Sequence, residues 1–218
     1  MAWFLTILLL LMSDDVSGFA AKKKPNKKKG SSASSNKGFG AAPPTLEEVA
    51  SKFRLRTPDD APSLPCPCQV GNKLYSDCCL PYHNGEKAPE SPLRVLQSRY
   101  SAFSYRLVPY VITTTHPSSR EYRDNKVQWA KDLNKEGMFD SFEFVQLVIP
   151  DLEPEMDGDD QAYMNFQVRL RAKGGDNMET IVSERSLFKR DPETNVWSYA
   201  SGDVRSEEAG LEDLVLNP

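Results

Sequence analysis

All four cysteines of this 218-residue chain lie within one 14-residue window, as Cys66, Cys68, Cys78 and Cys79. Zinc binds thiolates and imidazoles that converge on it at about 2.0–2.3 Å in a tetrahedron. Two close pairs of ligands on either side of a short turn supply that convergence at little cost in chain entropy. The window therefore predicts a zinc knuckle over residues 61–87, with Zn²⁺ in a structural role.

Two alternatives within this window stay open. Bridges inside each pair would be strained, but disulfides between the pairs are compatible with an even number of cysteines. The long chain that follows can build a core without such bridges, which favours zinc. The fourth ligand is also open, because His83, one of only two histidines, competes with Cys79 for that position.

The first 44 residues read as a targeting segment. Ala2–Met12 is an uncharged apolar run, too short for a bilayer span of roughly 20 residues but suited to a signal peptide over residues 1–18. Residues 19–44 are basic, rich in small residues and predicted to be disordered. The order resembles the bipartite plastid presequence of diatoms and related algae, in which phenylalanine, here Phe19, follows cleavage. We expect a plastid location, with secretion as the alternative, and no membrane span in the mature chain.

The remaining chain is acidic. Seven of the 27 basic residues and two of the 31 acidic residues precede Thr45, which leaves 20 basic and 29 acidic residues and a formal charge of −9. Binding to a phosphate backbone needs a positive surface. The composition therefore argues against a nucleic-acid partner.

Helical signals dominate the first half of this chain. Thr45–Glu48 reads as a capping box for a short helix to about Phe53, within a helix-and-linker segment over 45–60. Ser91 and Pro92 predict a helix to about Tyr105, with a shorter one from Pro109 to Thr114. A further capping box at Ser118 predicts a helix that Gly137 closes.

After about residue 141, apolar residues recur at every second position. Strands are predicted over 142–149, 164–171, 179–188 and 196–201, joined by turns at 174–177 and 191–195. Helices followed by antiparallel strands indicate the α+β class, with the helices packed on one face of a curved sheet. An acidic tail is expected over 206–218.

Several motifs together resemble the YchJ-like family. The cysteine window and the sequence Pro81–Gly85 are similar to the SEC-C zinc motif that opens its bacterial members. The later similarities lie at Gln97–Phe103, Thr115–Arg120, Glu184–Phe188 and Trp197–Tyr199. The resemblance implies a nuclear-transport-factor-2-like (cystatin-like) cone over residues 88–205. Gln69-Val70-Gly71 departs from the usual Gly-Ser turn, and no second copy of the motif follows.

Two classes of function follow from the resemblance. One is a binding module, in which the knuckle contacts another protein and the cone holds a small ligand. The other is an enzyme that uses His116 with Glu184 and Tyr199 for acid–base chemistry. Arg99, Tyr100 and Arg185 are further candidates for the cone pocket. His116 could instead cap a turn and Glu184 could belong to a structural ion pair, so we favour binding over catalysis.

Overall fold

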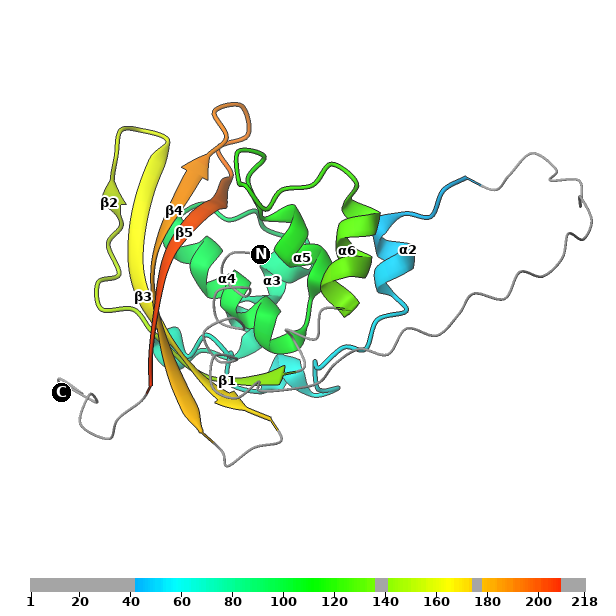
Figure 1. The fold of residues 1–218 in the computed structure, drawn as a ribbon, viewed down its shortest axis with the longest axis horizontal. Coiled ribbons are helices and arrows are strands. Elements are labelled where there is room, and N and C mark those ends of the chain that lie inside the picture. Colours follow the sequence, from blue (N-terminus) through cyan, green and yellow to red (C-terminus); the bar gives the residue numbers. More distant parts are fainter. Residues whose placement is uncertain (1–41, 136–140, 174–177, 209–218) are drawn as a thin grey trace, which may run out of the picture.

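The computed structural model describes residues 42–135, 141–173 and 178–208 (Figure 1). The first element is helix α2, Leu46–Ala50. The predicted capping box is confirmed, because the Glu48 amide donates to Thr45 Oγ1 over 3.1 Å and the Thr45 amide donates to Glu48 Oε2 over 2.8 Å. The helix ends at Ala50, three residues earlier than predicted. The predicted signal and transit segment lies outside the described residues, apart from 42–44.

Three longer helices follow the knuckle. Helix α4 spans Pro92–Tyr105 and helix α5 spans Val108–Thr113, close to their predicted bounds. Helix α6 spans Lys126–Lys135, so the predicted start at Ser118 is wrong. No helix in the described ranges is long and apolar enough to cross a membrane.

The helix starts late because the Ser118 region forms a turn instead. The Ser118 amide donates to His116 Nδ1, and the Glu121 amide donates to Ser119 Oγ. The side chain of Asn125 accepts from the Gln128 amide over 3.0 Å, as an N-cap does. The predicted stop at Gly137 lies outside the described residues.

The second half of the chain forms one antiparallel sheet in the order β1-β3-β4-β5, with β2 paired to β3. The four predicted strands are confirmed, and β2 was not predicted. Strand β5 runs past its predicted end at 201 and into the predicted tail. The bounds are β1 Phe142–Val148, β2 Glu155–Met156, β3 Gln161–Ala172, β4 Glu179–Arg190 and β5 Trp197–Glu208.

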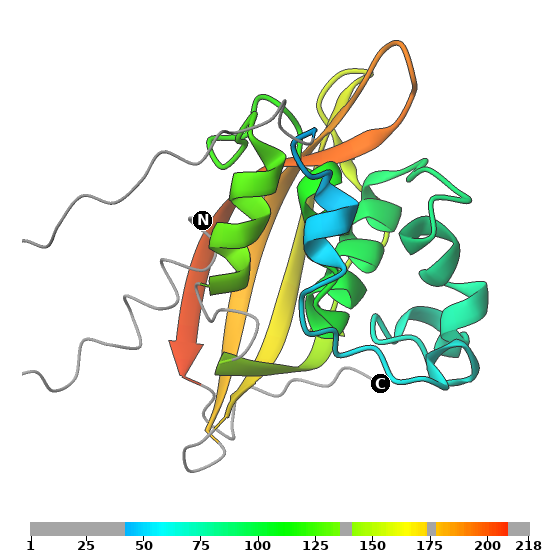
Figure 2. The ribbon, with the colours of Figure 1, turned by 90° about the vertical axis from the view of Figure 1, so that its right-hand side faces the viewer.

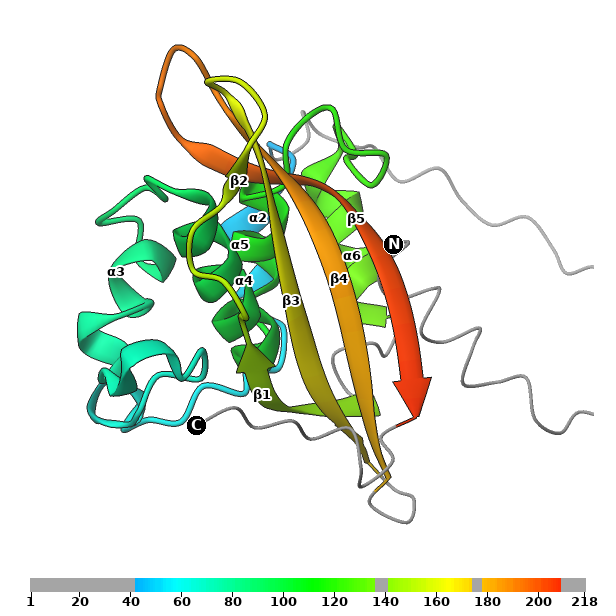
Figure 3. The ribbon, with the colours of Figure 1, turned by 90° about the vertical axis from the view of Figure 1, so that its left-hand side faces the viewer.

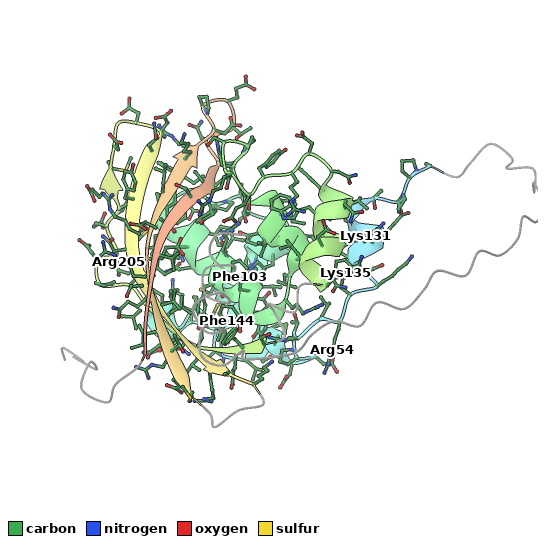
Figure 4. The ribbon with its side chains drawn as sticks, viewed as in Figure 1. Arg54, Phe103, Lys131, Lys135, Phe144 and Arg205 are labelled. Atoms are coloured by element: carbon green, nitrogen blue, oxygen red, sulfur yellow. The ribbon has the colours of Figure 1, made fainter. Side chains whose placement is uncertain are left out.

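The sheet curves around the helices, which cover its concave face (Figures 1 and 3). Alternate residues of β3 and β4 point inward and are buried, among them Phe166, Val182 and Phe188. Inside this cone, Phe103 of α4 and Phe144 of β1 stack with ring centroids 6.1 Å apart (Figure 4). The α+β cone predicted from the sequence is therefore the observed fold.

Candidate metal centre and interior cavity

The knuckle is built from short turns rather than long elements. Three single-turn 3₁₀ segments and the four-residue helix α3 follow one another as η1 Ala61–Ser63, η2 Val70–Asn72, η3 Tyr75–Asp77 and α3 Leu80–His83. The Cys66 amide donates to the Lys73 carbonyl over 2.9 Å, which closes the loop between the cysteine pairs. The knuckle lies beside α4, on the side away from α6 (Figures 2 and 3).

The atypical turn adopts an unusual backbone. Gln69, Gly71 and Asn72 all have positive φ, at 57°, 74° and 50°. Glycine adopts this region without cost, whereas other residues need support. The side chain of Gln69 donates to the Val145 carbonyl of β1 over 3.1 Å. The turn that departs from the family pattern is thereby tied to the cone.

The four sulfur atoms converge on one point. All lie within 4.8 Å of one another, and all four cysteines are buried and free. The measured separations are 3.5 Å from Cys68 to both Cys66 and Cys78, and 3.8 Å from Cys78 to Cys79. Four ligands at about 2.3 Å from one metal ion lie about 3.8 Å apart in a tetrahedron. The cluster fits a metal ion, and no pair is close enough for a disulfide.

The thiols interact strongly with one another. Hydrogen bonds from neighbouring thiols, Cys68 first, lower the pKa of Cys66. Contact with Cys66 raises the pKa of Cys68 and of Cys79. The same contact acts on Cys78, but hydrogen bonds from Cys68 and Cys79 lower the pKa of Cys78 overall. Thiolates and thiols therefore share the buried cluster, because several negative charges at this distance repel one another. A bound cation would allow all four to ionise.

His83 is committed elsewhere. Its Nε2 lies 2.9 Å from the Ser98 carbonyl, to which it donates, so Nδ1 accepts from the Tyr75 hydroxyl over 2.5 Å. Burial lowers the pKa of His83 and favours this neutral form. Both ring nitrogens are occupied, which leaves Cys79 as the fourth ligand that the geometry offers.

Helix α4 connects the cysteines to the cone. The Ser101 hydroxyl donates to Cys79 Sγ over 3.3 Å and lies 3.6 Å from Cys66 Sγ. The Ser98 carbonyl accepts a hydrogen bond from His83, and the Ser98 hydroxyl accepts one from the Tyr110 hydroxyl. Polar partners that hold metal ligands in place also tune the affinity of a site. The next positions, Arg99 and Tyr100, face the other way, into the cone.

A cavity of about 50 Å³ lies between α4 and the concave face of the sheet. Its walls are largely apolar and aromatic, with Phe103, Trp129, Phe166 and Phe188 among them. Its polar lining residues are Arg99, Tyr100, Thr115, Glu121, Glu184, Ser186 and Tyr199. An apolar chamber with a few convergent polar groups is typical of a small-molecule site.

Arg99 brings a positive charge into this chamber. Its Nη1 donates to the Val111 carbonyl and to the hydroxyls of Thr114 and Thr115, over 2.8, 2.9 and 3.2 Å. The guanidinium carbon lies 4.7 Å from the centre of the Tyr199 ring. These partners are neutral, and burial lowers the pKa of Arg99. The chamber thus holds a buried cation that no hydrogen-bonded carboxylate in the described residues balances.

Glu184 on β4 carries the second unusual group. Its Oε1 accepts a short hydrogen bond from the Ser186 hydroxyl, while Oε2 is buried without a partner in the described residues. Burial raises the pKa of Glu184 to about 8. A Cβ on Gly202 of β5 would overlap this carboxyl group and reach the Tyr199 hydroxyl at 3.0 Å. Gly202 therefore leaves room for the Glu184 carboxyl group, and the Tyr199 hydroxyl lies close to the same point.

His116 does not join them. Its backbone amide donates to the Tyr199 carbonyl over 2.7 Å, but its ring Nδ1 serves the Ser118 turn and does not line the cavity. Arg185 points away as well, because it pairs with Glu155 over 2.7 Å and covers the Tyr163 ring. Of the predicted pocket residues, the structure brings together Arg99, Tyr100, Glu184 and Tyr199. The predicted combination of His116 with Glu184 and Tyr199 is not formed.

Comparison with known proteins now identifies the family. Residues 91–202 match the family described as YchJ, middle NTF2-like domain. The chain belongs to the YchJ-like family. A UPF0225 protein of Sodalis glossinidius is 31% identical over 143 residues, which cover 63% of this chain and 82% of that protein.

Two solved structures resemble this YchJ-like chain. A SEC-C motif containing protein from Rhodopseudomonas palustris is 26% identical, with a TM-score of 0.51 over 64% of this chain and 98% of that one. A sec-c motif containing protein from Psychrobacter arcticus is 20% identical, with a TM-score of 0.50 over 68% of this chain and 87% of that one. The second likeness concerns the fold alone.

Sequence reasoning missed the residues that support both sites. Ser98 and Ser101 are spaced one helical turn apart and are fully buried, which a serine pair in an amphipathic helix could have signalled. Ser186 and Gly202 matter only because Glu184 is buried between them. No local pattern in the sequence announces that contact.

Proposed function

We propose that this chain is a small-molecule-binding protein whose knuckle is held by a structural zinc ion. The observation that carries the proposal is the cavity, in which Glu184 Oε2 and the Tyr100 hydroxyl are buried without partners in the described residues. Buried polar atoms without hydrogen bonds cost about 1–3 kcal/mol each. A ligand that bonds to them would remove that cost.

Zinc is the metal that the donor set favours. Four buried cysteine sulfurs at tetrahedral spacing suit Zn²⁺ better than magnesium or calcium, which prefer oxygen. A site closed by four protein ligands has no open position for a substrate. We therefore assign the metal to folding, with Cys66, Cys68, Cys78 and Cys79 as ligands.

A ligand screen on the full chain tests the cavity proposal. We expect at least one class of small probe, whether acid, amide, amine or alcohol, to bind and to change the fluorescence of Trp129, which lines the cavity. The variant Val111→Phe would fill the cavity and abolish binding, whereas Val148→Phe, on an exposed strand position, would not. Binding that survives Val111→Phe would refute the cavity as the site.

One observation supports an enzymatic alternative. Glu184, with its raised pKa, lies beside the Tyr199 hydroxyl, and such pairs move protons in many active sites. Catalysis would require that a ligand found in the screen is converted and that Glu184→Gln stops the conversion without stopping binding. The protein partner of the knuckle and the plastid location stay predictions from the sequence.

A further inference from the structure

We propose that the ligand of the cone cavity is a small monocarboxylate, with its anionic group on Arg99 and Tyr100 and its short apolar part against Phe166 and Phe188. This inference rests on the proposed function, because it names the chemical class that the cavity takes. It follows from the charges and donors that the cavity brings together.

The first argument is charge balance. Burying a cation is costly unless an anion or strong hydrogen bonds compensate it. Arg99 uses Nη1 for three neutral oxygens, and its Nε and Nη2 form no hydrogen bond within the described ranges. A carboxylate is planar and matches the fork of a guanidinium, so it would supply the missing charge and accept from these nitrogens.

The second argument is the excess of donors. The Tyr100 hydroxyl is buried without a partner among the described residues. Glu184, when protonated, offers a further hydroxyl from the opposite wall of the cavity. Arg99, Tyr100 and Glu184 all line the same chamber. A set dominated by donors favours an acceptor-rich group such as a carboxylate over an ammonium group, which can only donate.

The third argument is size. A cavity needs about 10–15 Å³ to hold one water molecule. A volume of 50 Å³ therefore corresponds to a ligand of only a few non-hydrogen atoms. The aromatic walls exclude a second charged end. Propionate therefore fits the chamber better than a dicarboxylate or a sugar acid.

The charged and titratable groups that face Glu184 come from several elements. They are Arg99 on α4, Glu121 after α5, and Tyr199 and Asp203 on β5. Glu121 is half-exposed, so solvent screens its repulsion of an anion more than it screens the attraction of buried Arg99. Above about pH 8 Glu184 ionises and repels a bound carboxylate. Carboxylate binding should therefore weaken as the pH rises through that value.

The test compares propionate with propionamide and propylamine on the full zinc-loaded chain. We expect propionate to bind at least tenfold more tightly than either analogue at pH 7, and to lose about tenfold between pH 7 and 9. Glu184→Gln should keep the binding at pH 7 and remove the loss at pH 9. Arg185→Gln, the neighbouring residue on the opposite face of β4, is the matched control and should behave as the wild type.

The charge requirement is tested at Arg99. Arg99→Lys should retain part of the affinity for propionate, and Arg99→Gln should lose it. If Arg99→Gln fails to fold, the comparison of the three probes and the Glu184→Gln variant still decides the question. Tighter binding of propionamide or propylamine would overturn the carboxylate inference while leaving the cavity proposal intact. Absence of binding by every probe class would overturn both.

Discussion

The buried polar atoms of the knuckle converge on one point, whereas those of the cone stay apart around a cavity. In the knuckle, four sulfurs lie 3.5–3.8 Å from their neighbours and form a set that one cation completes. In the cone, Arg99 and Glu184 reach the same cavity from α4 and β4 without forming a mutual hydrogen bond among those found in the described residues. A complete set of metal-coordinating sulfurs suits a structural metal. Polar groups without partners suit a small molecule that binds reversibly.

The two sites also share one helix. On α4, Ser98 and Ser101 face the knuckle while Arg99, Tyr100 and Phe103 face the cavity. A shift of this helix would therefore be felt at both sites. Four changes test this contrast between the metal site and the cavity, beginning with the largest expected effect.

Removing one metal ligand should have the largest effect. Cys68→Ser replaces a fully buried sulfur, and we expect the free energy of unfolding to fall by about 4 kcal/mol or more, together with loss of the metal. Denaturant unfolding and metal analysis measure both quantities. His83→Gln is the matched control, because it should keep about one metal ion per chain; loss of the metal in that variant would make His83 a ligand.

The pH dependence of stability should report on Glu184. Its pKa is raised from 4.5 to about 8 on folding, so between these values the folded chain holds a proton that the unfolded chain has lost. Stability should therefore be greatest below pH 4.5 for this group and fall by about 1.4 kcal/mol per pH unit up to pH 8. Glu184→Gln should flatten this slope in pH-dependent unfolding experiments. An unchanged slope would mean that Glu184 is ionised in the folded chain.

Filling the space beside Glu184 should cost less. Gly202→Ala places a methyl group where the Glu184 carboxyl lies, and we expect a loss of about 1–3 kcal/mol. In a Glu184→Ala background the same change should cost much less, because the overlapping atoms are gone. Ser201→Ala, at an exposed neighbouring position, is the control. Additive losses in the double variant would show that the two residues do not meet.

The smallest changes compare the serines that support each site. Ser101→Ala and Ser186→Ala each remove a hydroxyl that donates to a functional group, and each should cost about 1 kcal/mol. Ser101→Ala should also weaken metal binding by roughly tenfold in a chelator competition. Ser186→Ala should raise the pKa of Glu184 further, because the lost hydrogen bond lowers it. Weaker metal binding in Ser186→Ala, or a changed pKa of Glu184 in Ser101→Ala, would contradict the assignment of each serine to its site.

The contrast also explains what could be predicted from the sequence. The four cysteines lie within 14 residues, so their spacing alone indicated their convergence. The period-two pattern of β3 and β4 revealed the sheet for the same local reason. The cavity instead joins Arg99 to Glu184, which lies 85 positions further along the chain, and Gly202 packs against the Glu184 carboxyl group. Only the register of β4 against β5, which pairs Ser186 with Gly202, brings the last two together.

Errors arose where a local pattern had two outcomes. Ser118 fits a capping box, but its backbone amide donates to the His116 ring within a turn, and the helix begins at Lys126, with Asn125 as its cap. His116 was also a reasonable candidate for the pocket, since it adjoins Thr115, which does line the cavity. Thr115 pairs with Tyr199 in a parallel β-bridge, in which successive side chains point to opposite sides, so the His116 side chain points away from the cavity.

One experiment tests whether the cone binds the ligand while the knuckle only holds the metal. Amide chemical shifts of the full ¹⁵N-labelled, zinc-loaded chain would be followed by NMR during titration with propionate, propionamide and propylamine. We expect the probe that binds to move the amides of Tyr100, Ser186 and Gly202 while those of Cys66 and Cys78 stay in place and the metal is retained. Shifts confined to the knuckle, or release of the metal on binding, would contradict a structural knuckle beside a ligand-binding cone.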